Sequence, residues 1–342
     1  MASYYEDVCS QPGALRGCAE ELRRGGAEAR LRALCARRYT RVIFAGMGSS
    51  NYCAVPADLF LCAHGVPSVR WSASELLHYR MGALDGGTLL VLNSQSGESA
   101  EIVRLLERLP GGVPVTAVTN DPDSTLARRA NWLFPMDVET EEAVTTRTFV
   151  AAEAIDLLIA QSLAGISFGN FFLSLLKVCK DMETVLSRGD EIRKVLWDAL
   201  GAPAQLCLLG RGCSLCTVHA GTLFLREIVK YPAFGELCGE FRHGPMEMVD
   251  GGFAGIVLGP EDATAPLQRS LAADIREKGG RIAYLGNVEL KGIPSVILPK
   301  TEEWLSPLTT ILPIQLYADA LAGARGVEAG KFRWGSKITK TE

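Results

Sequence analysis

The sequence predicts an α/β protein with two tandem, doubly wound parallel-sheet subdomains of the flavodoxin-like type. Short apolar segments alternate with amphipathic ones over most of the chain, which indicates parallel strands covered by helices on both faces. The 342 residues are enough for two ordinary domains. A Gly-x-Gly turn between an apolar run and a helix-like run occurs twice, at Gly46-Met-Gly48 and at Gly210-Arg-Gly212. A unit that occurs twice favours a duplicated fold over one large irregular domain.

The first half of the chain shows the alternation most clearly. Residues 1–38 are rich in Ala, Leu, Arg and Glu and are expected to be helical, with breaks at Pro12-Gly13 and Gly25-Gly26. After them, each short apolar run is followed by a helix-like segment. The expected strands are 41–46, 67–71, 88–93, 114–119 and 132–136, and the expected helices are 51–64, 73–82, 98–108, 123–130 and 147–164.

The second half repeats the pattern after a helical connector at 169–200. The expected strands are 204–210, 253–258, 281–285 and 295–299, and the expected helices are 214–230, 264–278 and 304–324. The last residues are polar and lack periodicity, so we expect a tail whose order depends on packing. The resulting division is an N-terminal helical segment (1–38), a first domain (39–168), the connector (169–200), a second domain (201–325) and a C-terminal tail (326–342).

Composition excludes several classes of partner. Hydrophobic residues make up 48% and charged residues 22% of the chain, as in ordinary globular proteins. The net charge is −4 and the Lys and Arg residues are scattered, which argues against nucleic acid. The N-terminus lacks a signal-peptide pattern, and the apolar stretches, such as 168–176, are too short for a bilayer. Most of the ten cysteines lie in apolar runs. We therefore expect a cytoplasmic protein without disulfides.

Two loops rich in hydroxyl groups follow expected strands. They are Gly46-Met-Gly-Ser-Ser50 and Asn93-Ser-Gln-Ser-Gly-Glu-Ser99. Ligands of open parallel sheets bind beyond the carboxyl ends of the strands, where backbone N–H groups are free, and such loops can hold a phosphate dianion without Lys. The alternative is that Ser and Gly simply form turns and helix caps. Two such loops at neighbouring sheet positions favour an anion site.

The glycine turns do not indicate a nucleotide or another cofactor. The third glycine of a dinucleotide fingerprint would fall at Asn51, and no Walker lysine follows the turn. Cys213-Ser-Leu-Cys216 could be redox-active at a helix start, but the thioredoxin-like context is absent and no second cysteine pair has metal-ligand spacing. We expect neither a metal ion nor an organic cofactor.

Glu227 and His243 are the candidate acid–base pair. Glu227 lies in an expected helix among apolar residues, and a carboxylate partly removed from water is a better base. His243 lies in Gly239-Glu-Phe-Arg-His-Gly-Pro-Met-Glu247, and an imidazole titrates near neutral pH. The alternative is a solvated helix Glu and a loop His that caps a turn.

Three motifs together resemble the sugar isomerase (SIS) family, in particular the isomerase half of glucosamine-6-phosphate synthase. They are Gly48-Ser-Ser50, Ser94-Gln-Ser-Gly-Glu-Ser99 and Thr145-Thr-Arg-Thr-Phe149. The resemblance covers nearly all of residues 40–342. It implies that the 6-phosphate of a sugar is held by Ser49, Ser94, Gln95, Ser96 and Ser99. It also implies that Ser50 and the segment around Ala143 line the sugar.

The same resemblance implies catalytic roles. Glu227 would move a proton between C1 and C2, and His243 would open the sugar ring. The family often supplies this His from the other subunit, so a homodimer or higher homo-oligomer is implied. Lys337 in the tail would correspond to the lysine that reaches the sugar carbonyl. One departure is Phe224, which stands where the synthase has a further active-site lysine, and this puts the synthase reaction in doubt.

The segment from Gly239 to Glu247 resembles fructoselysine-6-phosphate deglycases more closely, and there Glu240 would contact the substrate. Ala2 stands where glutamine-dependent synthases have a catalytic Cys, so we expect no ammonia release from glutamine. The leading interpretation is a deglycase that acts on a sugar phosphate. The alternatives are an isomerase or deaminase of an amino-sugar phosphate, and a sensor. Sensors usually lack the Glu/His pair or add a DNA-binding domain, so an enzyme is favoured.

Overall fold

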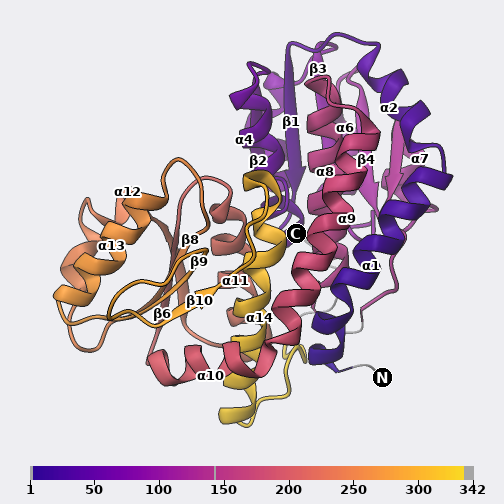
Figure 1. The fold of residues 1–342 in the computed structure, drawn as a ribbon. Coiled ribbons are helices and arrows are strands. Elements are labelled where there is room, and N and C mark those ends of the chain that lie inside the picture. The colour runs from indigo at the N-terminus through magenta and orange to yellow at the C-terminus, as the bar shows by residue number, and fades with distance from the viewer. Residues whose placement is uncertain (1–2, 142–143, 335–342) are drawn as a thin grey trace. The chain divides into compact units, whose positions relative to one another are not determined.

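The computed structural model describes residues 3–141 and 144–334, and these form two compact units (Figure 1). The N-terminal unit consists mainly of residues 10–141 and 145–177, and the C-terminal unit mainly of residues 178–332. Each unit contains one sheet of five parallel strands flanked by helices. The structure therefore confirms the tandem α/β fold and the helical N-terminus.

The sheet of the N-terminal unit has the order β2-β1-β3-β4-β5. Its strands are β1 (Arg41–Gly46), β2 (Ser68–Ser72), β3 (Thr88–Asn93), β4 (Val115–Thr119) and β5 (Trp132–Pro135). All neighbouring pairs are parallel. The chain passes from β1 to β2 on one side and then crosses to β3 on the other, so the direction of winding changes between β1 and β3. Sheets of this order bind ligands at that switch point, beyond the carboxyl ends of the strands.

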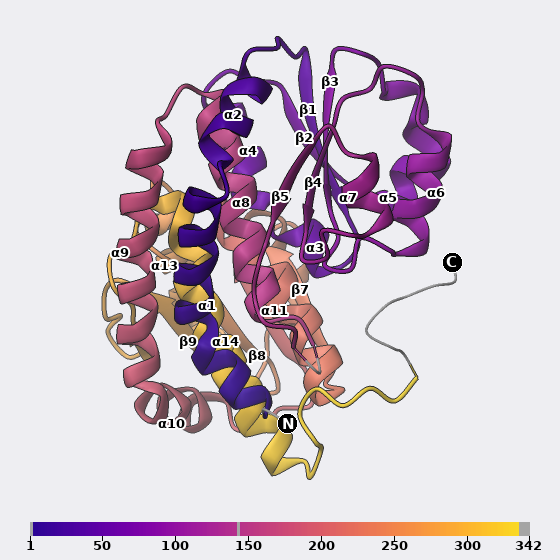
Figure 2. The same cartoon turned by 90° about the vertical axis from the view of Figure 1, so that its right-hand side faces the viewer.

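Helices cover both faces of this sheet. Figure 2 shows α5, α6 and α7 on one face of β1–β5 and α2, α4 and α8 on the other. Residues on every position of β3 are buried, because the strand lies in the centre of a sheet covered on both sides. The helices are α1 (Tyr4–Arg24), α2 (Ala27–Cys35), α3 (Ser49–Tyr52), α4 (Val55–Ala63), α5 (Ala73–Glu75), α6 (Ala100–Arg108), α7 (Thr125–Arg129), α8 (Arg147–Leu163) and α9 (Phe168–Ser187).

Two helix predictions for this region were wrong in detail. The break expected at Pro12-Gly13 is absent, because α1 continues through Pro12 and buries Leu15 and Leu22. That burial outweighs the backbone hydrogen bond lost at a proline. The break at Gly25-Gly26 is confirmed, with Gly26 at φ 76°. The helix expected at 51–64 is divided into α3 and α4, and Pro56 lies in the first turn of α4, where a proline is tolerated.

The C-terminal unit repeats the same topology with the sheet order β10-β9-β8-β6-β7. Its strands are β6 (Leu206–Gly210), β7 (Ala233–Leu237), β8 (Ala254–Gly259), β9 (Arg281–Gly286) and β10 (Ser295–Ile297), and its helices are α10 (Gly189–Leu200), α11 (Ser214–Val229), α12 (Cys238–Phe241), α13 (Ala265–Glu277) and α14 (Ser306–Ala324). In both sheets the second strand in chain order lies at the edge, next to the first strand. The third strand lies on the other side of the first, so the direction of winding changes between the first and third strands.

Strand β7 and the short helix α12 were missed in the sequence. β7 contains Gly235 and Glu236 and is half-buried over most of its length, so it has no apolar alternation to reveal it. It lies at the edge of the sheet, and among the described residues β6 is its one partner strand. The pairing of its backbone with β6, and the approach of α11 behind it, define the strand in place of a side-chain pattern.

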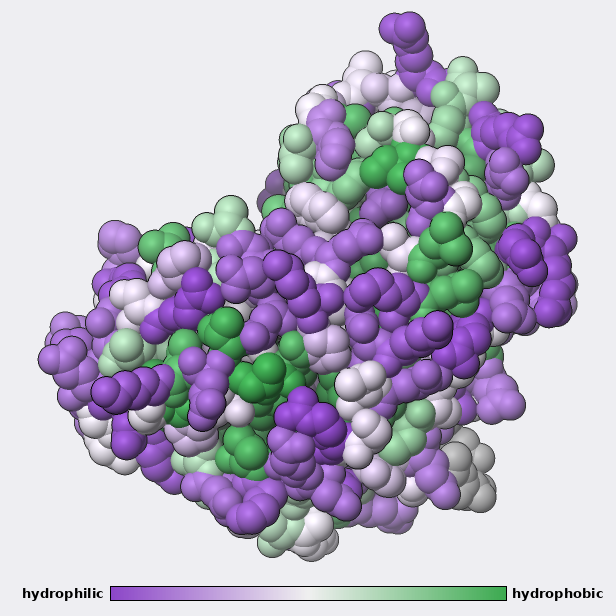
Figure 3. All heavy atoms as spheres, viewed as in Figure 1, coloured by the Kyte–Doolittle hydropathy of each residue, from purple (hydrophilic) through white to green (hydrophobic). Residues whose placement is uncertain are grey.

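The described residues contain no helix that is long and apolar enough to cross a membrane. On the face shown in Figure 3, hydrophobic residues form small separate patches between hydrophilic ones. Scattered patches of this size are normal on a protein surface.

Candidate functional site

The first hydroxyl loop connects β1 to α3 and is closely packed against the end of β3. A side chain at Gly46 would place its Cβ 2.5 Å from the Ser50 carbonyl oxygen and 2.9 Å from that of Asn93. Gly48 has φ 52°, a conformation that favours glycine. Ser49 and Ser50 follow it at the start of α3 and are half-buried. The two glycines therefore determine the path of the backbone that presents these hydroxyl groups.

The second hydroxyl loop follows β3 and is held by its own side chains. The Gly97 N–H donates to Ser94 Oγ at 3.1 Å, and the Glu98 N–H donates to Ser96 Oγ at 3.2 Å. Ser94 Oγ also lies 3.2 Å from Ser99 Oγ. Ser94 is buried, whereas Gln95, Ser96 and Ser99 are half-buried. Each serine retains further hydrogen-bonding capacity for a ligand, because one hydroxyl can donate once and accept twice.

Gly97 and the flanking groups attach this loop to β4 and α7. Gly97 has φ 63°, and a Cβ there would lie 2.1 Å from Ser124 Oγ, so no other residue fits without movement. The Gln95 carbonyl accepts from the Asn120 N–H at 2.9 Å. The Glu98 carboxylate accepts from the Thr125 N–H at 2.5 Å, at the start of α7. The only carboxylate of the loop is therefore engaged with a helix N-terminus.

The structure brings these predicted binding residues to one edge of the sheet. β1 and β3 are neighbours, with Ala45 opposite Leu92, so the two loops leave the sheet side by side at its switch point. Neither loop contains Lys or Arg. An anion bound here would be held by hydroxyl groups, backbone amides and helix dipoles.

Glu227 lies on α11 in the C-terminal unit and is half-buried. Burial raises the pKa of its carboxyl group, and the positive charge of Lys230 opposes that rise. The Lys230 Nζ donates to the Glu227 carbonyl oxygen at 2.8 Å, which keeps this cation on the same turn. A carboxylate with a raised pKa is a stronger base than a solvated one, as carbon acid chemistry requires.

His243 and Glu240 lie on the segment that follows β7. His243 is exposed in the turn after α12, and its backbone N–H donates to the Glu240 carbonyl at 2.8 Å. Gly244 adopts φ 139° and Pro245 follows it, which closes the turn. Within the described residues, no hydrogen bond or ion pair joins Glu227 to His243 or to Glu240. The C-terminal unit thus presents the base and the imidazole on separate elements.

Several other sequence predictions are placed by the structure. Phe224 is fully buried in α11, where it packs as a core residue. Cys213 and Cys216 are buried, which does not favour redox chemistry. Ala143 and Lys337 lie outside the described residues.

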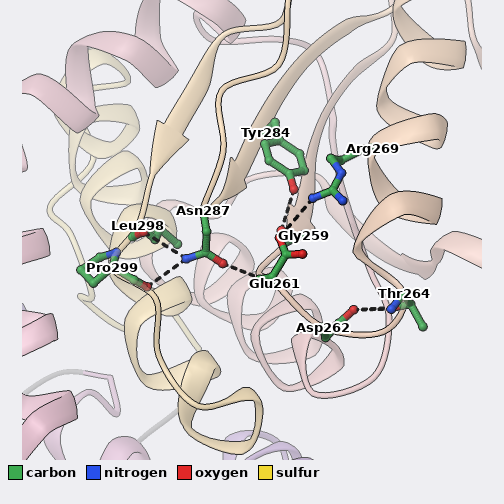
Figure 4. Close-up of polar contacts among 9 residues, drawn as sticks. All are labelled: Gly259, Glu261, Asp262, Thr264, Arg269, Tyr284, Asn287, Leu298 and Pro299. Atoms are coloured by element: carbon green, nitrogen blue, oxygen red, sulfur yellow. Dashed lines mark hydrogen bonds and ion pairs between the residues drawn. The ribbon is translucent and has the colours of Figure 1, made fainter.

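The carboxyl edge of the second sheet differs from that of the first in its chemistry. Figure 4 shows that its loops are bound to one another. Asn287, after β9, donates from Nδ2 to the Leu298 and Pro299 carbonyls at 3.0 Å, and its Oδ1 accepts from the Glu261 N–H at 2.6 Å. Tyr284 donates to the Gly259 carbonyl at 2.6 Å. Side chains of the protein therefore already form hydrogen bonds with these backbone carbonyl and N–H groups, which a ligand at this edge would otherwise contact.

The loop after β8 carries two carboxylates, Glu261 and Asp262, whereas the corresponding loop after β3 carries one, Glu98, among its serines. Glu261 forms an ion pair with Arg269 at 3.2 Å, and Asp262 accepts from the Thr264 N–H at 2.6 Å. Arg269 offsets the charge of Glu261, but Asp262 has no ion pair among the described residues, and its negative charge disfavours an anion here. Of the two switch points, the one in the N-terminal unit is therefore suited to phosphate.

Comparison with known proteins identifies the first unit. Residues 37–161 match the family described as SIS domain. This part of the chain is a SIS domain. The chain is also homologous to one half of glutamine–fructose-6-phosphate aminotransferases [isomerizing]. It is 29% identical over 298 residues to the protein of Pyrococcus horikoshii, covering 84% of this chain and 50% of the relative. For the protein of Bacillus subtilis the identity is 26% over 303 residues, covering 86% and 50%. The chain thus spans about half the length of these relatives.

Solved structures share the complete fold. The C-terminal domain of glucosamine-fructose-6-phosphate aminotransferase from Francisella tularensis has a TM-score of 0.83 at 21% identity, covering 97% of this chain and 98% of its own. Tagatose-6-phosphate ketose/aldose isomerase from Escherichia coli has a TM-score of 0.82 at 19% identity, covering 98% of both chains. Glucosamine-6-phosphate deaminase from Thermotoga maritima has a TM-score of 0.79 at 18% identity, covering 98% and 99%. At these identities the likeness establishes the fold.

One group of residues near the loops was missed in the sequence. Cys53, Asn93 and Asp156 are buried and in mutual contact next to the SIS domain loops. The available signal was a polar residue within an apolar run, in Leu-Leu-Val-Leu-Asn93 and in Ala-Ile-Asp156-Leu-Leu. Sequence reasoning could not show that the three meet, because they are separated by up to 103 positions.

Proposed function

We propose that this protein is a phosphosugar-processing enzyme that acts on a ketosamine or amino-sugar 6-phosphate by moving a proton between C1 and C2. The reaction we propose is deglycation, which releases an amine and a hexose 6-phosphate. The observation that carries the proposal is the preformed pair of hydroxyl loops at the switch point of the SIS domain. The names of the homologous aminotransferases and of the structural neighbours also refer to sugar phosphates.

The proposal assigns the phosphate to the N-terminal unit. The hydroxyls of Ser49, Ser94, Ser96 and Ser99 and the amide of Gln95 would donate to its oxygens. Ser50 and the segment around Ala143 would line the sugar. Hydrogen bonds from neutral donors can hold a dianion when helix N-termini add their dipoles. Because neither loop contains Lys or Arg, the phosphate would be held without an ion pair, which allows the product to be released.

The proton transfers are assigned to the C-terminal unit. His243 would open the sugar ring by moving a proton between the ring oxygen and the C2 hydroxyl. Glu227 would then remove a proton from C1 of the ketosamine, giving an enolamine, and return it to C2. This step leaves an imine at C1, which water cleaves to the amine and the aldose 6-phosphate. Lys337 would polarise the carbonyl, and Glu240 would contact the amine-bearing end of the substrate.

The sugar isomerase or deaminase reaction is the second candidate. It needs the same base and the same ring-opening group, and differs only in the substituent on C1 or C2. The curated relatives are named isomerizing, and one neighbour of similar fold is a deaminase. A sensor function is less well supported, because sensors of this fold usually lack the Glu/His pair, and this chain has both Glu227 and His243.

A homodimer or higher homo-oligomer is part of the proposal. The side chain of His243 is exposed in the single chain, as expected for a group that completes the site of a neighbouring subunit. Sedimentation velocity and size-exclusion chromatography with light scattering would measure the oligomeric state. A strictly monomeric active enzyme would contradict this part of the proposal.

Three substrates distinguish the reactions. Purified protein is incubated with fructoselysine 6-phosphate, with glucosamine 6-phosphate, and with fructose 6-phosphate plus ammonia, and products are followed by mass spectrometry. Release of lysine and glucose 6-phosphate from the first is expected. Turnover of only the second or third would replace deglycation with deamination or isomerisation. Binding without turnover of any of them would favour the sensor.

A further inference from the structure

A buried polar cluster in the N-terminal unit connects the two hydroxyl loops. We use the name loop brace for Cys53, Asn93 and Asp156. The Asn93 Nδ2 donates to Asp156 Oδ2 at 2.7 Å, and the Cys53 thiol donates to the same oxygen at 3.6 Å. All three residues are at most 1% exposed. They come from the α3–α4 junction, the end of β3 and the middle of α8, all within the N-terminal unit.

The loop brace is connected directly to both loops. The Cys53 Sγ also lies 3.3 Å from the Ser50 carbonyl oxygen, so its single S–H is shared between Asp156 and the last residue of the first hydroxyl loop. Asn93 immediately precedes Ser94, the first residue of the second. Asp156 accepts hydrogen bonds from both Cys53 and Asn93. Its position on α8 is fixed because this helix is buried along nearly its whole length. Movement of the Asp156 carboxyl group would therefore change the spacing of the two loops.

The surroundings favour an uncharged Asp156. Burial raises the pKa of its carboxyl group to about 8, with the hydrogen bonds from Asn93 and Cys53 opposing the rise. Burial and the charges of Asp156 and Glu153 raise the pKa of the Cys53 thiol, while Arg70 on β2 opposes it. The Oδ1 atoms of Asn93 and Asp156 have no hydrogen-bond partner among the described residues. An ionised carboxylate would need more donors than this pocket supplies.

We propose that Asp156, acting through Asn93 and Cys53, is a positioning residue that sets the spacing of the phosphate loops, and that its ionisation weakens sugar-phosphate binding. This inference rests on the proposed function, because it takes the two loops to be the phosphate site. Two effects act in the same direction. The charge repels the phosphate, and an under-solvated carboxylate draws donors away from the loops.

The binding experiment uses fructose 6-phosphate as the probe and calorimetry as the measurement. Dissociation constants are compared between pH 7.5 and pH 9.5, where the sugar phosphate is already dianionic. The wild-type affinity is expected to fall about tenfold over this range, by the repulsion of two nearby charges. Asp156→Asn keeps the shape and removes the ionisable group, so its affinity should stay constant. Equal pH dependence in the two proteins would overturn the proposal.

Two further variants separate the brace from general effects. Asp58→Asn changes another partly buried carboxyl group, on α4, which forms no hydrogen bond with either loop among the described residues. It should keep the wild-type pH profile. Cys53→Ala removes the thiol contacts with both Ser50 and Asp156. It should weaken binding at pH 7.5, and because the thiol opposes the rise in the pKa of Asp156, the fall in affinity should move to higher pH in this variant. If Cys53→Ala binds fructose 6-phosphate as tightly as the wild type does, the thiol does not contribute to the loop brace.

Hydrogen exchange tests the brace without a ligand. Short labelling pulses compare the backbone amides of residues 46–53 and 93–99 in wild type and Asp156→Asn at the same pH. At pH 9, exchange in the wild type should be several-fold faster than in Asp156→Asn. At pH 6.5, the two proteins should exchange at the same rate. Equal exchange at pH 9 would overturn the brace. If exchange differs as expected but fructose 6-phosphate binds neither protein, the brace stands and the proposed phosphate site is wrong.

Discussion

The two sheets of this protein have the same strand order but different chemistry at their switch points. In the N-terminal unit the loops after β1 and β3 present serines and backbone amides. In the C-terminal unit the loop after β8 carries Glu261 and Asp262, and the neighbouring loops are joined through Asn287. The comparison teaches that topology determines where a ligand can bind, whereas a few loop residues determine whether an anion is accepted.

The strongest test of a division between binding and chemistry is Glu227→Gln. If the C-terminal unit supplies the base, kcat should fall about a thousandfold, within the usual range for a general base. The dissociation constant for fructose 6-phosphate should stay within about threefold of wild type, because the phosphate loops are untouched. Steady-state kinetics on the substrate identified above and calorimetry measure the two quantities. Full activity in this variant would show that another group is the base.

Gly97→Ala and Gly212→Ala compare the glycine requirement of the two units. Both glycines have positive φ, 63° and 52°, but a Cβ at Gly97 collides with Ser124 while one at Gly212 meets nothing within 4 Å. Gly97→Ala should lower the free energy of unfolding by about 3 kcal/mol, through backbone strain and loss of the Ser124 cap of α7. Gly212→Ala should cost about 1 kcal/mol from strain alone.

Urea denaturation measures both changes, and fructose 6-phosphate titration adds a functional readout. Binding should be lost or strongly weakened in Gly97→Ala and retained in Gly212→Ala. If the two variants lose equal stability and equal affinity, the two glycine turns do not differ as the structure implies.

Asp156→Asn should stabilise the protein at alkaline pH. The folded-state pKa of about 8 lies above the ordinary value near 4, so the folded state binds the extra proton between these limits. Wild-type stability therefore falls as pH rises from about 4 to 8, on the order of a few kcal/mol, and then levels off. The Asn variant lacks this loss. Its advantage should be largest above pH 8 and should vanish near pH 4.

Urea denaturation at pH 5 and pH 8.5 checks this expectation. The exposed Asp123→Asn serves as the control and should change stability by less than about 0.5 kcal/mol at either pH. A constant difference between wild type and Asp156→Asn across the two conditions would show that Asp156 is ionised throughout.

Ser96→Ala and Thr264→Ala give the smallest expected effects. Ser96 lies in the second hydroxyl loop, and its removal should raise KM about tenfold through one lost hydrogen bond to a charged group, with kcat nearly unchanged. Thr264 lies in the corresponding region after β8 and should leave KM unchanged. Steady-state kinetics decide. An unchanged KM for Ser96→Ala, or an increase for Thr264→Ala, would reverse the assignment of the phosphate to the first sheet.

Much of the fold could be predicted because its signals are local. The apolar run before Gly46 and the one before Ser94 each define a strand and the loop that follows it. The doubled Gly-x-Gly turn predicted the repeat of topology. The hydroxyl loops themselves are contiguous in sequence, so their composition was visible before their position was known.

Other features depended on contacts between distant residues. The helix α1 continues through Pro12 because packing of its apolar face outweighs a local defect, and β7 exists because β6 offers a partner for its backbone. The loop brace unites Cys53, Asn93 and Asp156 from three elements, and no local pattern could indicate that they meet. The sequence by itself determined the strands, the glycine turns and the hydroxyl groups, since these depend on neighbouring residues. Tertiary structure decided which polar groups lost their water, because desolvation depends on everything packed around a residue.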